Sequence, residues 1–225
     1  MKFRHVLLLT FLILLIDQTL KIWIKTHFYI GDEKYILGSW FRLHFIENEG
    51  MAYGWKFGGN WGKMILTLFR LFAVVFGTYY IQRIIRQGYN KWFIVCATLI
   101  YAGAIGNLLD SMFYGLIFDN SDPFMQNVAR LFPPGGGYAG FLHGKVVDML
   151  YFPIIHDAHF PSWFPLWGGE EFEFFRPVFN VADASISIGV IAILVFQKRF
   201  FEKKNQESHP TIETNSTVND EVQVS

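Results

Sequence analysis

The stretch FNVADASISIGVIAILVF, Phe179–Phe196, carries a single charged residue near the start of an otherwise apolar run. A run of this length can cross the hydrocarbon core of a bilayer as a helix, which takes about 20 residues. The charged residue is Asp183, and an ionisable group inside a membrane segment is costly and is usually kept for a function. We therefore expect a membrane-spanning helix that presents a functional carboxylate near one membrane surface.

Three further apolar segments of similar length precede this stretch. The four predicted spans are Val6–Ile24, Met64–Ile81, Trp92–Leu109 and Phe179–Phe196. The composition agrees, because 52% of the residues are hydrophobic, 19% are aromatic and only 17% are charged, which is unusual for a soluble domain. A net charge of zero argues against a nucleic-acid partner. The single cysteine, Cys96, excludes an internal disulfide framework and is expected to be a packing residue.

Basic residues of the short connections lie on one predicted side of the membrane. They are Lys2 and Arg4, then Arg83, Arg86 and Lys91, then Lys198, Arg199, Lys203 and Lys204. Such clusters favour the cytoplasm, so both termini are predicted to be cytoplasmic. Residues 25–63 and 110–178 then face outward. Residues 1–204 form the membrane domain, and the polar residues 205–225 are expected to be a disordered cytoplasmic tail.

The outward residues Tyr35–Phe57 mix aromatic and β-branched side chains in partial alternation, which favours short strands. The predicted fold is thus an all-α membrane protein of four transmembrane helices with a small extracytoplasmic subdomain that contains short β-strands.

Polar residues of the four spans lie toward their outward ends. They are Asp17 and Lys21 in the first span, Arg70 in the second, Asn107 and Asp110 at the end of the third, and Asn180 and Asp183 at the start of the fourth. Their common depth predicts one polar site near the outer interface. Taken singly, Asp17–Lys21 and Arg70 are explained as well by structural ion pairs or by side chains that reach the membrane surface as by a functional site.

Two outward stretches add polar groups to this site. FIENEGMAYG, Phe45–Gly54, is a polar, glycine-containing loop between apolar flanks. HGKVVDMLYFP, His143–Pro153, places Asp148 among apolar neighbours, so that desolvation should raise its pKa. Two carboxylates in different protonation states suit general acid–base hydrolysis, because one activates water and the other protonates a carbonyl oxygen.

Five short motifs occur in a fixed order along the chain. They are DQTLK (Asp17–Lys21), NEGMAY (Asn48–Tyr53), GAIGNLLD (Gly103–Asp110), VVD (Val146–Asp148) and FNVAD (Phe179–Asp183). In this order and on four spans, they resemble the boxes of the lipoprotein signal peptidase family, signal peptidase II, whose members are intramembrane aspartyl proteases. The resemblance extends over most of residues 6–196.

This resemblance implies roles for individual residues. Asp148 and Asp183 match the catalytic dyad. Residues that match the boxes lining or bracing the site are Asn48, Gly50, Ala52, Asn107, Asp110, Asn180 and Ala182, with Asp17 and Lys21 as structural support. The implied substrate is a diacylglyceryl-modified prolipoprotein, cut just before its lipid-modified cysteine. No metal or organic cofactor is implied. We expect a monomer in the lipid of a bacterial inner membrane, with its active site near the outer leaflet.

The chain departs from the family pattern at several places. Ser111 follows Asp110 where an arginine is common, and Met149 stands where phenylalanine is frequent after the VVD aspartate. Insertions occupy residues 111–145 and 154–177, and the second is rich in tryptophan and phenylalanine, which suit the membrane interface. These insertions bear on substrate access more than on chemistry.

Two other functions are compatible with parts of the sequence. A proton-coupled transporter would also bury carboxylates, but transporters usually carry internal repeats and polar residues at the membrane midplane. A metalloprotease could use His156, Asp157 and His159 with His143, although no HExxH motif is present. A purely structural membrane module would leave Asp183 without a role.

Overall fold

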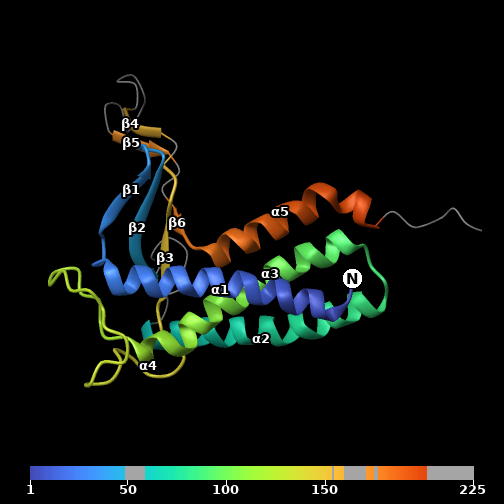
Figure 1. The fold of residues 1–225 in the computed structure, drawn as a ribbon, viewed down its shortest axis with the longest axis horizontal. Helices are drawn as coiled ribbons and strands as arrows, with labels where there is room; N and C mark the ends of the chain where they lie inside the picture. Colours follow the sequence, from blue (N-terminus) through green and yellow to red (C-terminus); the bar gives the residue numbers. More distant parts are fainter. Residues whose placement is uncertain (49–58, 154, 160–170, 175–176, 202–225) are drawn as a thin grey trace, which may run out of the picture.

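Four long helices lie side by side with a β-sheet at one end in the computed structural model, which describes residues 1–48, 59–153, 155–159, 171–174 and 177–201 (Figure 1). The helices are α1 (Phe3–His27), α2 (Gly59–Arg86), α3 (Lys91–Leu109) and α5 (Val181–Phe201). All four are long and apolar enough to cross a membrane. The predicted four-span helical fold is confirmed.

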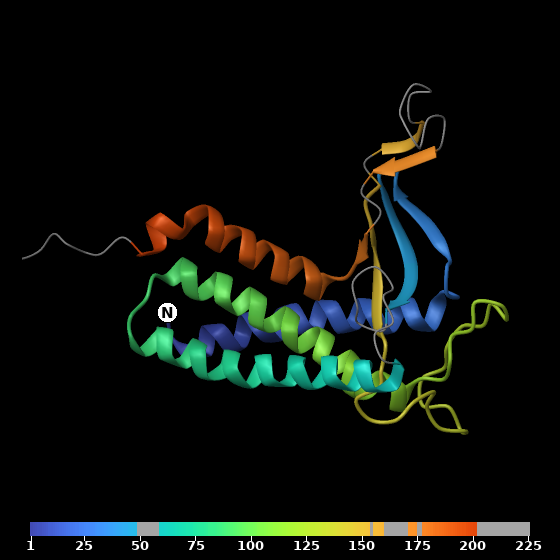
Figure 2. The same ribbon diagram turned by 180° about the vertical axis from the view of Figure 1, so that it is seen from behind.

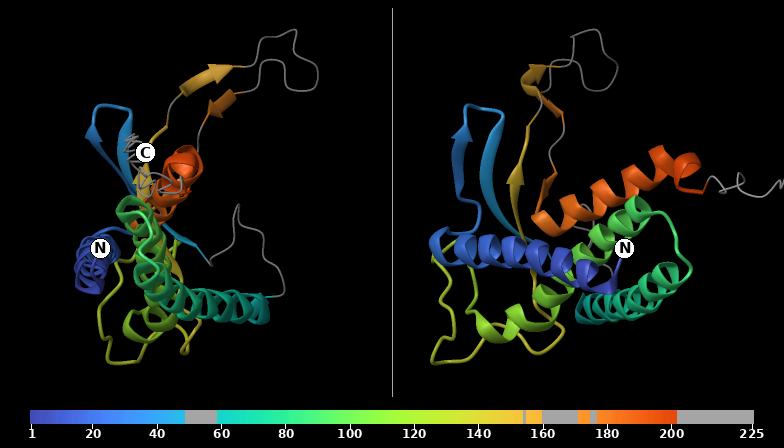
Figure 3. Two further views of the ribbon diagram at one scale, coloured as in Figure 1. Left: turned by 90° about the vertical axis from the view of Figure 1, so that its right-hand side faces the viewer. Right: turned by 45° about the vertical axis from the view of Figure 1, so that its right-hand side comes forward.

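Helix α3 is the centre of the bundle and contacts each of the other three helices (Figure 3). Small residues allow this packing: a Cβ at Gly189 of α5 would lie 2.7 Å from the carbonyl oxygen of Cys96. Cys96 is itself buried, as the sequence predicted. Large apolar side chains such as Phe11, Phe72 and Ile191 point away from the bundle and are exposed. Their outward position is typical of a surface that faces lipid.

The third and fourth spans differ from the prediction at their polar ends. The third helix continues through a π-helical turn, η2 (Asp110–Tyr114), into α4 (Gly115–Ile117), so Asp110 lies inside a helix. The fourth helix begins at Val181, two residues later than predicted. Residues Val178–Phe179 form strand β6 instead, because their backbone pairs with a neighbouring strand.

The sheet has the antiparallel strand order β1-β2-β3-β6 (Figure 2). Its first two strands, β1 (Glu33–Leu37) and β2 (Phe41–Asn48), confirm the predicted strands, while residues 49–58 lie outside the described part of the chain. The sequence did not predict β3 (Val146–Tyr151), which lies between β2 and β6 and carries Asp148. A separate hairpin, β4 (Ile155–His159) and β5 (Glu171–Phe174), lies within the aromatic stretch that was expected at the membrane interface.

An apolar core attaches the sheet to the end of α1. Phe45 of β2 and Val147 and Met149 of β3 are fully buried against Ile24 and Phe28 from the last turn of α1 and the residues that follow it. Tyr114, Phe118 and Ala129 complete this core from the insertion 111–145. The insertion therefore packs beneath the sheet.

A buried ionic cluster lies beside this core. The Glu47 cluster consists of Lys25, Glu47, Ser121, Tyr138 and Lys145. The Glu47 carboxylate pairs with Lys25 and, at 3.0 Å, with Lys145, and accepts a hydrogen bond from Ser121 at 3.2 Å. Burial alone would raise the pKa of Glu47, but the two lysines hold it below its ordinary value. The cluster joins α1, β2, the insertion and the start of β3.

Replacing Glu47 by glutamine should strongly destabilise the protein, because it leaves the fully buried Lys25 without its counter-charge. Removing one partner of a buried ion pair costs about 3–5 kcal/mol. In a chain of this size we expect Tm in detergent to fall by roughly 10 °C.

The matched control is the same change at Glu33, which pairs with Arg42 at 2.6 Å in the same sheet but keeps 29% of its side chain exposed. Exposed ion pairs contribute under about 1 kcal/mol, so Glu33→Gln should leave Tm nearly unchanged. Equal effects of the two substitutions would contradict a role of the Glu47 cluster in stability.

Candidate functional site

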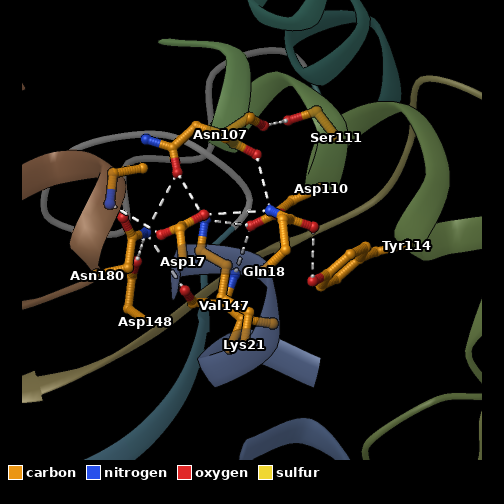
Figure 4. A network of polar contacts seen from close by, with 12 residues as sticks. Asp17, Gln18, Lys21, Asn107, Asp110, Ser111, Tyr114, Val147, Asp148 and Asn180 are labelled. Carbon is orange, nitrogen blue, oxygen red and sulfur yellow. Dashed lines mark hydrogen bonds and ion pairs between the residues drawn. The ribbon is translucent and has the colours of Figure 1, made fainter. Parts of the chain in front are cut away.

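The predicted site residues that the structure describes meet where the helices join the sheet (Figure 4). Nine of them are described and belong to one connected set of polar contacts, namely Asp17, Lys21, Asn48, Asn107, Asp110, Asp148, Asn180, Ala182 and Asp183. Gly50 and Ala52 lie outside the described residues. Helix ends and strands from both halves of the chain therefore meet in this set of polar residues, which we call the polar layer.

Lys21 is the central cation of this layer. Its Nζ lies 2.9 Å from Asp17 and 2.8 Å from Asp110, and all three side chains are fully buried. It also donates a hydrogen bond to Asn107 at 3.1 Å. A lysine without access to water is tolerated only when it is paired in this way. The ion pairs of Asp17 and Lys21, which the sequence left as a possibility, therefore join α1 to α3 and η2.

Two residues of this layer were missed by the sequence analysis. Gln18 donates hydrogen bonds to Asp110 at 2.9 Å and to Asp17 at 3.1 Å, and it accepts one from the Tyr114 hydroxyl at 3.1 Å. Their spacing was a usable signal, because Gln18 lies three residues before Lys21 and Tyr114 four residues after Asp110 on one helix face. Gln18 thus completes the hydrogen bonds of the buried carboxylates, and Tyr114 in turn orients Gln18.

Asp17 also connects α1 to the start of α5. Its Oδ1 accepts a hydrogen bond of 2.8 Å from the backbone N–H of Ala182, in the first turn of α5. The first N–H groups of a helix have no partner within the helix, and a carboxylate there also suits the helix dipole. A Cβ at Gly106 would lie 2.9 Å from Asp17 and 3.0 Å from the Ala182 side chain, so this approach depends on a small residue in α3.

Asn180 and Asp183 form a capping box at the start of α5. The Asn180 side chain accepts from the N–H of Asp183 at 2.8 Å, and the Asp183 carboxylate accepts from the N–H of Asn180 at 3.5 Å. Asn180 and Asp183 therefore stabilise the start of α5, which the sequence analysis did not predict. A carboxylate in the first helical turn has a structural role in addition to any chemical one.

Asp148 lies on the sheet side of the layer and is buried, with 2% of its surface exposed. It accepts hydrogen bonds from Asn180 at 2.7 Å and from Asn48 at 3.4 Å. Burial, and then the nearby charge of Asp183, raise its pKa to about 7 despite these hydrogen bonds. The desolvation predicted from its apolar neighbours is confirmed.

Asp183 faces the same region from α5 and is only partly buried. It accepts a hydrogen bond of 2.7 Å from Asn107, which in turn accepts from Asn180 at 3.2 Å. Two asparagines therefore hold the two carboxylates in place. Each amide can donate to a carboxylate without transferring a proton, so the two asparagines fix the positions of the carboxylates.

Ser111 lies behind this layer, on the side of α2. It donates a hydrogen bond to the carbonyl oxygen of Asn107 at 2.9 Å and accepts one from Arg70 at 2.8 Å. Ser111 carries no charge, but its hydroxyl accepts a hydrogen bond from the guanidinium of Arg70 on α2. Arg70, which the sequence analysis noted only for its depth in the second span, thus reaches the polar layer.

Comparisons with known proteins find relatives over most of the chain. A family model described as signal peptidase (SPase) II matches residues 9–199. A lipoprotein signal peptidase of Porphyromonas gingivalis is 49% identical over 189 residues, which cover 84% of this chain and 80% of the relative. A lipoprotein signal peptidase of Amoebophilus asiaticus is 32% identical over 220 residues, covering 96% and 86%. A solved bacterial membrane enzyme superposes with a TM-score of 0.56 at 24% identity, covering 91% of this chain and 94% of that one, and shares its fold.

Replacing Asp148 by asparagine should stabilise the protein increasingly as pH rises. The folded chain retains the Asp148 proton up to about pH 7, whereas a carboxyl of ordinary pKa loses it near pH 4. The wild type therefore loses stability between these values, and asparagine does not. We expect a difference in Tm that grows from pH 4 to pH 7 and reflects on the order of 4 kcal/mol at its maximum. A difference that is independent of pH would contradict the raised pKa.

Replacing Gly103 by alanine should destabilise the packing of α3 against the start of α5, next to the site. The added Cβ would overlap the carbonyl oxygen of Ala182 and lie 2.7 Å from Ile186, which forces α3 and α5 apart. Overpacking of this kind costs about 1–3 kcal/mol, measurable as a lower Tm. The control Gly140→Ala meets nothing within 4 Å and should behave as wild type. Equal Tm values for the two variants would contradict this packing.

Proposed function

The chain belongs to the signal peptidase II family, and we propose that it is an aspartyl endopeptidase with Asp148 and Asp183 as its catalytic residues. Its substrates are diacylglyceryl-modified prolipoproteins, and it cuts just before the lipid-modified cysteine to release the signal peptide. The observation that carries this proposal is the pairing of the two carboxylates through Asn107 and Asn180.

The chemistry needs the two carboxyls to share one proton. Two carboxyl groups close together in a medium of low dielectric cannot both ionise cheaply, and the pKa of Asp148 of about 7 supports a neutral carboxyl at that position. We assign the carboxylate form to Asp183, which is less buried and accepts the hydrogen bond of Asn107. Asn180 and Asn48 then orient the Asp148 carboxyl.

In the first step Asp183 takes a proton from a water molecule, whose oxygen attacks the carbonyl carbon of the scissile peptide bond. Asp148 gives its proton to the carbonyl oxygen, which completes a neutral tetrahedral intermediate. In the second step the proton on Asp183 passes to the departing nitrogen as the carbon–nitrogen bond breaks. Asp148 recovers a proton from the hydroxyl, and the pair returns to its starting state.

The position of the site suits a substrate anchored in the membrane. The polar layer lies at the sheet end of the bundle, whereas the chain's N-terminus, the α2–α3 connection and the end of α5 lie at the opposite end (Figure 1). The basic residues of that opposite end favour the cytoplasm of a bacterial inner membrane, with both termini inside. The site then lies near the outer leaflet, where the diacylglyceryl chains can stay in lipid while the scissile bond reaches the two carboxylates.

Purified enzyme should cleave a diacylglyceryl-modified precursor, and Asp148→Asn and Asp183→Asn should each reduce cleavage by at least about 10³-fold, because an amide cannot carry a proton through the cycle. Asn48→Ala should cost less, since Asn48 only orients Asp148. Cleavage is measured from pH 4 to 10 and should follow a bell-shaped profile whose limbs belong to the pair.

Two comparisons make this test decisive. The unlipidated precursor should be cut far less well, because each buried methylene of the lipid contributes about 0.8 kcal/mol to binding. A chelator should have no effect. Near wild-type turnover in either aspartate variant, or activity that disappears on chelation, would contradict the aspartyl mechanism.

A further inference from the structure

The polar layer contains more carboxylates than cations. Among the described residues it holds four carboxyl groups, from Asp17 on α1, Asp110 on η2, Asp148 on β3 and Asp183 on α5, and two cations, from Lys21 on α1 and Arg70 on α2. Lys21 is engaged by Asp17 and Asp110 at hydrogen-bond distance. Arg70 is the second cation near the Asp148–Asp183 pair among the residues that the structure describes.

Arg70 reaches this pair through a chain of hydrogen bonds. Its Nη1 donates to the Ser111 hydroxyl at 2.8 Å, and that hydroxyl donates to the carbonyl oxygen of Asn107 at 2.9 Å. The Asn107 amide donates to Asp183 at 2.7 Å. The links meet at Asn107 through different groups, its backbone carbonyl and its side-chain amide, so Arg70 and Ser111 act on Asp183 through the position of Asn107.

The charge of Arg70 also acts on the pair through space. Among the described carboxylates it is attracted to Asp183 first, then to Asp110 and Asp148. Arg70 is partly buried on a helix whose neighbours Phe69 and Phe72 are exposed and apolar. A charge at such a position is screened less than one in water.

We propose that Arg70 is a positioning residue of the proteolytic site, which keeps one carboxylate of the Asp148–Asp183 pair ionised by its charge and holds Asn107 against Asp183 through Ser111. The inference rests on the aspartyl mechanism proposed above. It assigns to α2 a part in the chemistry, although that helix packs against α3 and supplies neither of the two carboxylates.

The charge and the hydrogen bond of Arg70 can be tested separately. Arg70→Gln removes the charge, and Arg70→Lys keeps it. Because a nearby cation favours the ionised form, its loss should move both limbs of the pH–rate profile to higher pH, by roughly one unit. Below the optimum, kcat of Arg70→Gln should then be about tenfold lower at a given pH, with KM unchanged. Arg70→Lys should keep the wild-type limbs.

Ser111→Ala removes the hydrogen bond and keeps the charge. It should lower kcat a few-fold through Asn107 without moving the limbs of the profile. The matched control is Arg83→Gln, the same change at an exposed position nearer the other end of α2, which should leave kcat, KM and the profile unchanged.

Relocating the charge gives an independent test. In the exchange variant Arg70→Ser with Ser111→Arg, a guanidinium is supplied to the polar layer from η2 instead of α2. We expect the wild-type profile and at least a tenfold recovery of kcat over Arg70→Gln. The exchange variant also tests the proposal if Arg70→Gln does not fold. A folded exchange variant whose pH–rate profile is shifted from that of the wild type would overturn the proposal.

Three further results would overturn it: an Arg70→Gln profile equal to that of Arg83→Gln, an Arg70→Lys profile shifted as far as that of Arg70→Gln, or a change in KM alone. These outcomes are separate from a failure of the proposed function. If the wild type does not cut the lipidated precursor, or if either aspartate variant does, the aspartyl mechanism itself is wrong.

Discussion

Lys21 is a cation without access to water, held between the carboxylates of Asp17 and Asp110. Taking these charges out of water is costly, and removing any one of them would leave another unpaired. The pairing therefore fixes how α1 lies against α3 at the level of the site. Asp17 extends the constraint to α5 through the N–H of Ala182, so three helices meet at one buried ion pair.

The two proposed catalytic carboxylates depend on this arrangement but come from different kinds of element. Asp148 projects from a central strand, and Asp183 from the first turn of a helix. Asn180 joins them, because it follows strand β6, caps α5 and donates to Asp148. Asn180 therefore links the last strand of the sheet to helix α5 and orients the Asp148 carboxyl group. The raised pKa of Asp148 costs stability near neutral pH, as expected for a group kept for chemistry.

The insertion 111–145 belongs to the support of the site. Its apolar residues pack beneath the sheet, and Ser121 and Tyr138 complete the Glu47 cluster. Glu47 is followed directly by Asn48, and Lys145 lies three residues before Asp148. The cluster therefore stabilises the ends of the two strands that carry these site residues. A segment expected to bear on substrate access has a clear structural role here.

The sequence alone determined the four spans, the first hairpin and most of the polar site, because apolar length and the motif residues are local signals. It also indicated the desolvation of Asp148 from its immediate neighbours. Only the tertiary structure decided that Val178–Phe179 is a strand, since its backbone pairs with β3, far away in the sequence. The same holds for Gln18 and Arg70, whose roles depend on Asp110 and Ser111 across helix interfaces. Spacing along a chain does not show which side chains come into contact when helices pack. Burial then decides which of the polar side chains in contact need a hydrogen-bond or charge partner.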